Sequence, residues 1–290
     1  MTRLTDEQIA AFRRDGYLMV GGAVDAAALA AMRRQLDDWI EESRGHAENW
    51  GETVGGASRF DLEAGHAAGA PRLRRINNPA EISDAFHAAT FDGPVAEMVA
   101  DLIGPDVKFH HGKINSKLPR TDSRVGLHQD FSYTPHTNDD IVTALLLLDD
   151  MTVENGPLRV APGTHREGQK SLWHDGVFTG QVAADVAAAV EDRLVTLTGK
   201  AGDVCLMHTN LLHGSAPNGS DERRTLFISV YTAADAVALA ASPLPNRFEN
   251  RIVAGQAVRT ARLTVDRVEL PAASHSGSFF NLTGQGTNTG

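Results

Sequence analysis

The sequence is poor in cysteine and has no long apolar run. Its single cysteine, Cys205, excludes an internal disulfide, and one thiol cannot build a cysteine-type zinc site. Because it stands in an apolar run, we expect Cys205 to be a small buried side chain. The longest purely aliphatic stretch, 144–148, is far shorter than a bilayer span, and the N-terminal residues lack the apolar core of a signal peptide. These absences predict a cytoplasmic protein with no membrane partner.

Positive charge is also scarce. The chain of 290 residues has 27 Lys and Arg against 37 Asp and Glu, a net charge of -10, so it lacks the broad positive field that binds nucleic acid. Neither a GxGxxG nor a GxxxxGK[ST] phosphate loop occurs. With 42% hydrophobic residues the composition is that of an ordinary globular protein, and its twelve histidines and carboxylates remain available for metal chemistry.

The first 105 residues read as mostly helical. Thr5 begins a capping box for a short helix that ends before Gly16, a strand follows over 17–20, and Asp25 caps a second helix. Residues 43–71 lose all periodicity and predict a long loop, either a lid or a plain excursion. A further helix is expected over 94–102.

From residue 107 onward the pattern changes to short apolar runs separated by turn residues. No alternation of strand with helix occurs there, so an antiparallel sandwich or small barrel is favoured over a parallel sheet. The expected strands are 107–117, 125–131, 141–148, 157–161, 194–197, 204–208 and 224–231.

A short motif in the second of these strands can bind a metal. His128 and Asp130 stand two residues apart, so on a strand their side chains leave the same face. One imidazole and one carboxylate can occupy adjacent positions of a metal octahedron, and a second histidine would complete a facial triad with three open positions. His208 and His213 are both candidates for it.

Arg224 supplies a separate indication. It alternates with Leu226, Ile228 and Val230, so it shares the apolar face of its strand. A guanidinium there cannot lose its charge and needs an anion, which is either an Asp or Glu partner or a bound ligand.

Several ordered motifs together resemble the phytanoyl-CoA dioxygenase-like branch of the Fe(II)/2-oxoglutarate-dependent oxygenases. The resemblance covers most of the chain. Its motifs are residues 12–17, the His128-Gln-Asp130 pair, residues 154–158 and 161–165, the turn 202–203, and His213-Gly-Ser215 followed by Asn218 and Arg224. It implies a mainly β fold with flanking helices and a double-stranded β-helix (jelly-roll, cupin-like) core. We therefore predict a single domain over 1–290, with helical support over 1–105, the jelly roll over 106–235 and a flexible tail over 274–290.

The resemblance assigns roles to particular residues. It implies that His128, Asp130 and His213 are the iron ligands, with His208 set aside because the family's ligand directly precedes the small Gly-Ser pair. It also implies that Arg224 binds the distal carboxylate of 2-oxoglutarate. Lys113, Asn115 and Lys117 share one face of the preceding strand, and the cosubstrate contact is expected from Asn115 or Lys117. Thr143 matches a position where a hydroxyl assists the same carboxylate, although a strand also favours threonine for its β-branch.

These residues imply an oxygenase that converts 2-oxoglutarate and O2 to succinate and CO2 while it hydroxylates, or otherwise oxidises, a C–H group of a small molecule. The charges of Fe(II), Asp130, Arg224 and 2-oxoglutarate cancel, so the assembled site can be buried. Asp130 argues against halogenation, because halogenating members lack this ligand. The longer motif of the ectoine hydroxylases is not found after Asp130.

Two other readings use the same residues. A jelly-roll isomerase or hydrolase could use the three ligands to hold a Lewis-acid metal, and a binding or sensor module could retain them without turnover. The sequence does not indicate the oligomeric state. The candidates for the substrate wall are Phe131, Tyr133, His136, Arg159, Trp173 and the 43–71 segment. The polar residues among them favour a small polar substrate over a fatty acyl chain.

Overall fold

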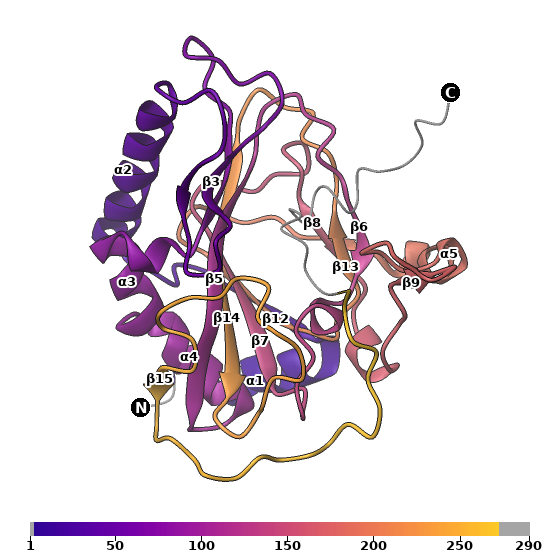
Figure 1. Ribbon diagram of the computed structural model, residues 1–290. Helices are drawn as coiled ribbons and strands as arrows, with labels where there is room; N and C mark the ends of the chain where they lie inside the picture. The colour runs from indigo at the N-terminus through magenta and orange to yellow at the C-terminus, as the bar shows by residue number, and fades with distance from the viewer. Residues whose placement is uncertain (1–2, 273–290) are drawn as a thin grey trace.

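Two antiparallel sheets form the core of the protein. The computed structural model describes residues 3–272, and Figure 1 shows a large sheet beside a small one. In spatial order the large sheet contains β1 (Tyr17–Val20), β12 (Val204–His208), β7 (Ile141–Leu147), β14 (Arg224–Ala233), β5 (Val107–Lys117), β4 (Leu73–Asn77), β3 (Ser58–Leu62) and β2 (Trp50–Glu52), with β15 (Ile252–Ala254) paired to β5. The small sheet contains β11 (Val195–Thr196), β8 (Leu158–Val160), β13 (His213–Ser215) and β6 (Val125–His128).

Five α-helices and a small hairpin complete the described part of the chain. The helices are α1 (Asp6–Asp15), α2 (Ala26–Ser43), α3 (Asp84–Phe91), α4 (Pro94–Ile103) and α5 (Ala184–Val190), and the hairpin is β9 (Trp173–His174) with β10 (Val177–Phe178). Among residues 3–272, no helix is both long enough and apolar enough to cross a bilayer.

The two sheets pack face to face through a buried apolar layer. Leu145 of β7 and Leu226 of β14 share one cluster with Leu158 of β8. Cys205 lies in the same cluster and is fully buried, as predicted. This arrangement confirms the predicted mainly β jelly-roll fold.

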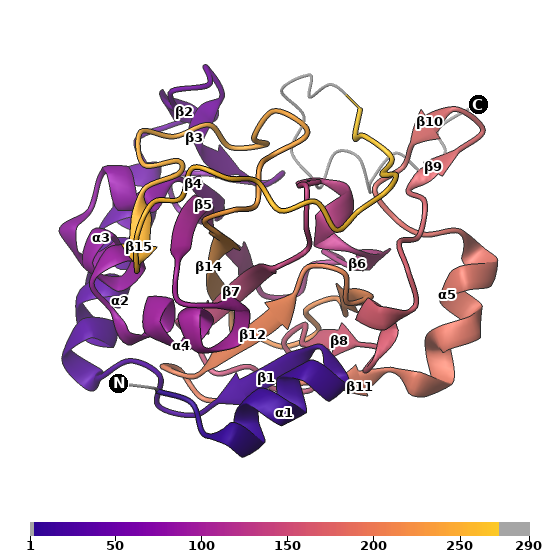
Figure 2. The ribbon, with the colours of Figure 1, turned by 90° about the horizontal axis from the view of Figure 1, so that it is seen from below.

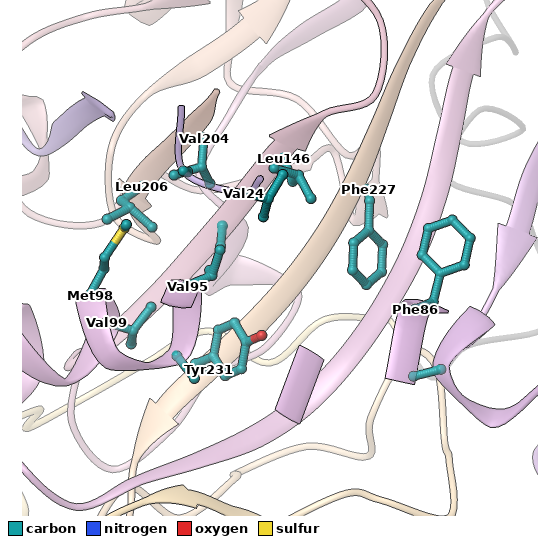
Figure 3. Close-up of a cluster of buried hydrophobic side chains, with 14 of the residues drawn as sticks. Val24, Phe86, Val95, Met98, Val99, Leu146, Val204, Leu206, Phe227 and Tyr231 are labelled. Atoms are coloured by element: carbon teal, nitrogen blue, oxygen red, sulfur yellow. The ribbon is translucent and has the colours of Figure 1, made fainter. Parts of the chain in front are cut away.

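Helices cover the other face of the large sheet. In Figures 1 and 2, α2, α3 and α4 lie together on the side away from the small sheet. Figure 3 shows the interface, where Val95 and Val99 of α4 and Phe86 of α3 meet side chains of the sheet such as Phe227 and Tyr231. The helices thus cover one face of the large sheet, and its other face packs against the small sheet.

The N-terminal expectations agree with the structure. Thr5 accepts a hydrogen bond from the backbone N–H of Gln8 and completes the capping box of α1. Gly16 ends this helix with φ of 81°, and a Cβ built there would lie 2.4 Å from the ring of His165. The position therefore requires glycine for its conformation and for the close approach of His165.

The prediction of a long loop over residues 43–71 was wrong. This segment contains β2 and β3, which extend the large sheet beyond β4. Trp50 stacks on Phe60 at 4.4 Å between ring centroids, and Phe60 also packs edge-on against Trp39 of α2 at 5.8 Å. Such strands leave no alternating pattern in the sequence.

Other differences are smaller. The expected strand over 125–131 ends at His128, and helix α3 and strand β13 were not predicted. The division of the chain at residues 105 and 235 stays a prediction, and the tail over 274–290 lies outside the described residues.

Candidate metal centre

Three side chains converge between the two sheets. One ligand atom each of His128, Asp130 and His213 lies within 4.8 Å of the others. The Oδ1 atom of Asp130 is 3.4 Å from Nε2 of His128 and 3.6 Å from Nε2 of His213. No other group of this kind occurs within residues 3–272. Two imidazole nitrogens and one carboxylate oxygen are the donor set of a facial triad, so the residues fit a divalent iron.

The backbone brings these residues together in an unexpected way. His128 ends β6 and is the register partner of His213 on β13, so the two imidazoles extend from neighbouring strands. Asp130 does not share a strand face with His128, because it begins a 3-10 turn over Asp130–Ser132. The turn carries the Asp130 carboxylate back toward both histidines.

Each histidine is oriented by its second ring nitrogen. Nδ1 of His128 donates to the Gly126 carbonyl at 2.9 Å, and Nδ1 of His213 donates to the Leu211 carbonyl at 3.0 Å. These bonds assign the ring proton to Nδ1 and leave an Nε2 lone pair facing Asp130. Burial, with the nearby His128, lowers the pKa of His213 to about 4. The ring is therefore neutral at pH 7, as a metal ligand must be.

Thr143 of β7 holds the carboxylate. Its hydroxyl donates to Oδ2 of Asp130 at 2.7 Å, which leaves Oδ1 for the histidines. Burial acts to raise the pKa of Asp130, but His213, His128 and the Thr143 hydrogen bond together hold it far below its usual range. The group is an ionised carboxylate in a fixed orientation.

A basic pair occupies a different part of the same cavity. Arg224 is buried at the start of β14 and is the register partner of Lys117 on β5. Its guanidinium donates to the carbonyl of Gly156 at 2.8 and 3.1 Å, and within the described chain it has no ion-pair partner. Burial lowers its pKa to about 10, so it stays charged at neutral pH.

Lys117 is also buried and bonded only to backbone oxygens in the described residues. Its ammonium donates to the carbonyls of Ser123 and Ala216. Burial and the adjacent charge of Arg224 lower the pKa of Lys117 to about 6. Asp149 acts on the charge of Arg224 and Asp122 on that of Lys117, but neither carboxylate forms an ion pair with them in the described residues, so a bound anion would stabilise this basic pair.

One cavity connects the metal residues with this basic pair. All seven predicted site residues line it, namely His128, Asp130, His213, Asn115, Lys117, Thr143 and Arg224. The structure therefore places them together, whereas their roles stay predictions. Thr143 is the register partner of Val230, six residues along β14 from Arg224, which is about 20 Å of extended strand. Its observed partner is Asp130 rather than a group near Arg224.

Lys113 was predicted to share a face of β5 with Asn115 and Lys117, but no role was assigned to it. Lys113 lines the cavity together with Asn115 and Lys117, as the alternation along this strand requires. Asn115 accepts a hydrogen bond from Nε of Arg75 on β4 at 3.3 Å. This bond assigns the amide oxygen toward Arg75, so the amide nitrogen is the end left for a ligand.

The five residues expected in the substrate wall do not line this cavity. Phe131 packs with Ile141 and Val230 in a small core cluster, because the chain turns inward after Asp130. The rejected His208 lies away from the triad and faces Asp139 at 3.9 Å. The remaining candidates are held by other partners: Tyr133 by the Gly180 carbonyl, His136 by the Thr134 carbonyl, Arg159 by Glu191 and Trp173 by the Leu270 carbonyl.

Comparisons with known proteins agree with this geometry. A family model described as "Phytanoyl-CoA dioxygenase (PhyH)" matches residues 12–226. The "Probable alpha-ketoglutarate-dependent hypophosphite dioxygenase" of Stutzerimonas stutzeri is 33% identical over 205 residues, which are 69% of this chain and 69% of that protein. The "Ectoine dioxygenase" of Sphingopyxis alaskensis is 26% identical over 250 residues, covering 79% of this chain and 76% of that protein.

A solved structure supports the fold. EctD from S. alaskensis, with 2-oxoglutarate and 5-hydroxyectoine, matches with a TM-score of 0.67 and 22% identity, covering 89% of this chain and 88% of that chain. The fold, the family match and the triad together confirm the predicted enzyme class, an iron- and 2-oxoglutarate-dependent dioxygenase. The chain belongs to the phytanoyl-CoA dioxygenase family.

Proposed function

We propose that His128, Asp130 and His213 hold Fe(II), and that Arg224 and Lys117 receive the distal carboxylate of 2-oxoglutarate. The observation that carries this proposal is the basic pair, which is buried, lacks a carboxylate partner in the described residues, and lines the same cavity as the triad. A dicarboxylate satisfies both groups of residues, because one end neutralises Arg224 while the other reaches the metal.

Bound Fe(II) would supply O2 activation at the positions that the three side chains leave open. The chain's own contribution is orientation and shielding. Thr143 fixes the Asp130 carboxylate, the backbone carbonyls of Gly126 and Leu211 fix the imidazoles, and Asn115 offers its amide nitrogen to the cosubstrate. Leu145, Leu158 and Leu226 exclude water around the carbon chain between the two ends.

The overall reaction is the oxidation of a small molecule. One oxygen atom of O2 enters the substrate, so that an X–H group becomes X–OH, and the other enters succinate as 2-oxoglutarate loses CO2. The relative named as a hypophosphite dioxygenase and the ectoine dioxygenase both indicate a small polar substrate rather than a fatty acyl chain.

Spectroscopy of the anaerobic protein tests these assignments. Fe(II) and 2-oxoglutarate added together should give a weak visible charge-transfer band, and His213→Ala should lose it along with iron affinity. His208→Ala is the matched control, since His208 is a second histidine of the same segment that lies outside the triad. Loss of the band in His208→Ala with retention in His213→Ala would contradict the proposed ligands.

Measuring succinate release with the same protein distinguishes this function from that of a Lewis-acid isomerase or hydrolase. An isomerase or hydrolase would turn over without consuming 2-oxoglutarate, whereas the proposed enzyme releases succinate in step with product. A binding or sensor module would release none with any substrate.

A further inference from the structure

A second cavity lies apart from the one that holds the triad, which we call the metal cavity. The second cavity has a volume of about 620 Å³, within the range of small-molecule sites, and shares no lining residue with the metal cavity. Its lining residues come from four parts of the chain: Asp139 and the segments 165–169, 208–210 and 265–267. Most of their side chains are polar or charged, so a ligand of this cavity would be a polar molecule.

His208 presents a hydrogen-bond donor to the second cavity. Its Nδ1 accepts from the backbone N–H of Asn210 at 3.1 Å, which assigns the ring proton to Nε2. Burial lowers the pKa of His208 to about 4, so the ring is neutral at pH 7. Nε2 is 3.9 Å from Oδ2 of Asp139, too far for a hydrogen bond, and has no other partner within residues 3–272. This N–H therefore suits an acceptor group of a ligand and does not suit a metal ion.

Asp139 places an acceptor beside this donor. Its Oδ2 accepts from Nδ2 of Asn210 at 3.0 Å, which fixes the orientation of the carboxylate. The side chain is 40% exposed, so the carboxylate remains accessible from the cavity. A donor and an acceptor 3.9 Å apart match the carboxylate and the ammonium group that an α-amino acid carries on one carbon atom.

Two arginines supply the positive charge of the same cavity. Arg166 and Arg267 are exposed, and neither forms an ion pair within the described part of the chain. Burial lowers the pKa of His165, as it does that of His208, so both rings are neutral at pH 7. Two arginines and Asp139 then leave the lining with one positive charge in excess. An amino acid with an acidic side chain has one negative charge in excess, so the charges of site and ligand cancel.

We propose that the second cavity binds an acidic α-amino acid. The α-carboxylate accepts from Nε2 of His208, the ammonium donates to Asp139, and the side-chain carboxylate meets the two arginines. This inference does not depend on the residues proposed to hold iron and 2-oxoglutarate, since the two cavities have no lining residue in common.

The same charges define the selectivity of the site. An amide in place of the side-chain carboxylate would leave Arg166 and Arg267 without an anion. A dicarboxylate without the ammonium would be repelled by Asp139. Binding should therefore require all three charged groups of the amino acid.

Calorimetric titration of the anaerobic Fe(II)·2-oxoglutarate protein tests the proposal, because saturating 2-oxoglutarate keeps a second dicarboxylate out of the metal cavity. The probes are L-glutamate and L-aspartate, compared with L-glutamine and glutarate. We expect at least one of the two acidic amino acids to bind roughly tenfold or more tightly than both L-glutamine and glutarate. The proposal is overturned if neither acidic amino acid binds, or if L-glutamine binds as tightly.

Variants of the lining residues locate the binding. Asp139→Asn should weaken the binding of the acidic amino acid by roughly tenfold and strengthen that of glutarate, a reversal that a loss of folding cannot produce. Arg166→Met should weaken the binding of both ligands. Arg120→Met is the matched control, since Arg120 is an exposed arginine that pairs with Asp221 at 2.8 Å outside the cavity, and it should titrate like the wild type. Wild-type affinity for the acidic amino acid in both Asp139→Asn and Arg166→Met would also overturn the proposal.

Discussion

The two ends of the cavity bury side chains of opposite charge. At the triad, two neutral imidazoles and a carboxylate face one another; each imidazole is oriented by the hydrogen bond that its Nδ1 donates, and the carboxylate by the one that its Oδ2 accepts. At the far end, Arg224 and Lys117 are basic groups that donate only to backbone carbonyls in the described residues. Under the proposed function the first end receives a cation and the second an anion, so one molecule that chelates the metal and carries a second carboxylate suits both.

The largest expected effect comes from removing the cation at the far end. Arg224→Met should raise the KM for 2-oxoglutarate by about 100-fold, because a buried carboxylate loses its charged partner. Iron affinity measured without cosubstrate should not change. Arg223→Met is the matched control: Arg223 is adjacent but pairs with Asp37 and Asp149 outside the cavity. If both variants raised the KM for 2-oxoglutarate equally, Arg224 would not be the residue that binds the cosubstrate at the far end of the cavity.

A moderate effect is expected at the metal end. Thr143→Val keeps the shape of the side chain but deletes the hydroxyl that holds Oδ2 of Asp130, so iron affinity should fall by about tenfold or more. Thr143→Ser should retain most of the affinity. If both variants instead raise the KM for 2-oxoglutarate and leave iron affinity unchanged, Thr143 serves the cosubstrate, as the family resemblance implied.

The pH dependence of cosubstrate binding probes the second basic residue. The pKa of Lys117 is about 6 because burial and Arg224 disfavour its charged form. A bound dianion favours the protonated form, so affinity for 2-oxoglutarate should rise as pH falls from 8 to 6. The change should be a few-fold, because Arg224 stays charged throughout, and Lys117→Met should lack it. An identical pH profile for both proteins would show that Lys117 does not meet the carboxylate.

The smallest effect concerns the fold rather than the site. Thr5→Ala removes the capping box of α1 and should reduce the free energy of unfolding by about 1 kcal/mol. Urea denaturation measures this loss. Fe(II) and 2-oxoglutarate affinities should be unaffected, since α1 contributes no residue to the cavity.

The strength of the local signal explains which elements the sequence could predict. Strand β5 is eleven residues long, and its observed bounds are those predicted. Strands β2 and β3 have only three and five residues, so they were predicted to be a loop. A long strand can be predicted from its own residues. A short strand depends on its pairing with residues elsewhere in the chain, which the local sequence does not show.

The same limit applies to the site. Arg224 stood out because an arginine on an apolar strand face is unusual, and the His128 and Asp130 pair stood out by its spacing. The hydrogen bond from Thr143 to Asp130 could not be predicted from the sequence. It depends on the end of β6 at His128 and on the turn that begins at Asp130. A hydrogen bond between residues of different sheets produces no pattern in the local sequence of either residue.

The bond between Thr143 and Asp130 also joins two layers of the molecule. Asp130 follows β6 of the small sheet, while Thr143 belongs to β7 of the large one. At the opposite end, Arg224 of the large sheet holds the carbonyl of Gly156, which precedes β8 of the small sheet. Under the proposed function, iron would bind Asp130 at the first of these contacts and the dicarboxylate would bind Arg224 at the second. A ligand at 100 times its Kd adds about 2.7 kcal/mol to the free energy of unfolding. Binding of iron and the dicarboxylate should therefore also raise the temperature at which the two sheets separate.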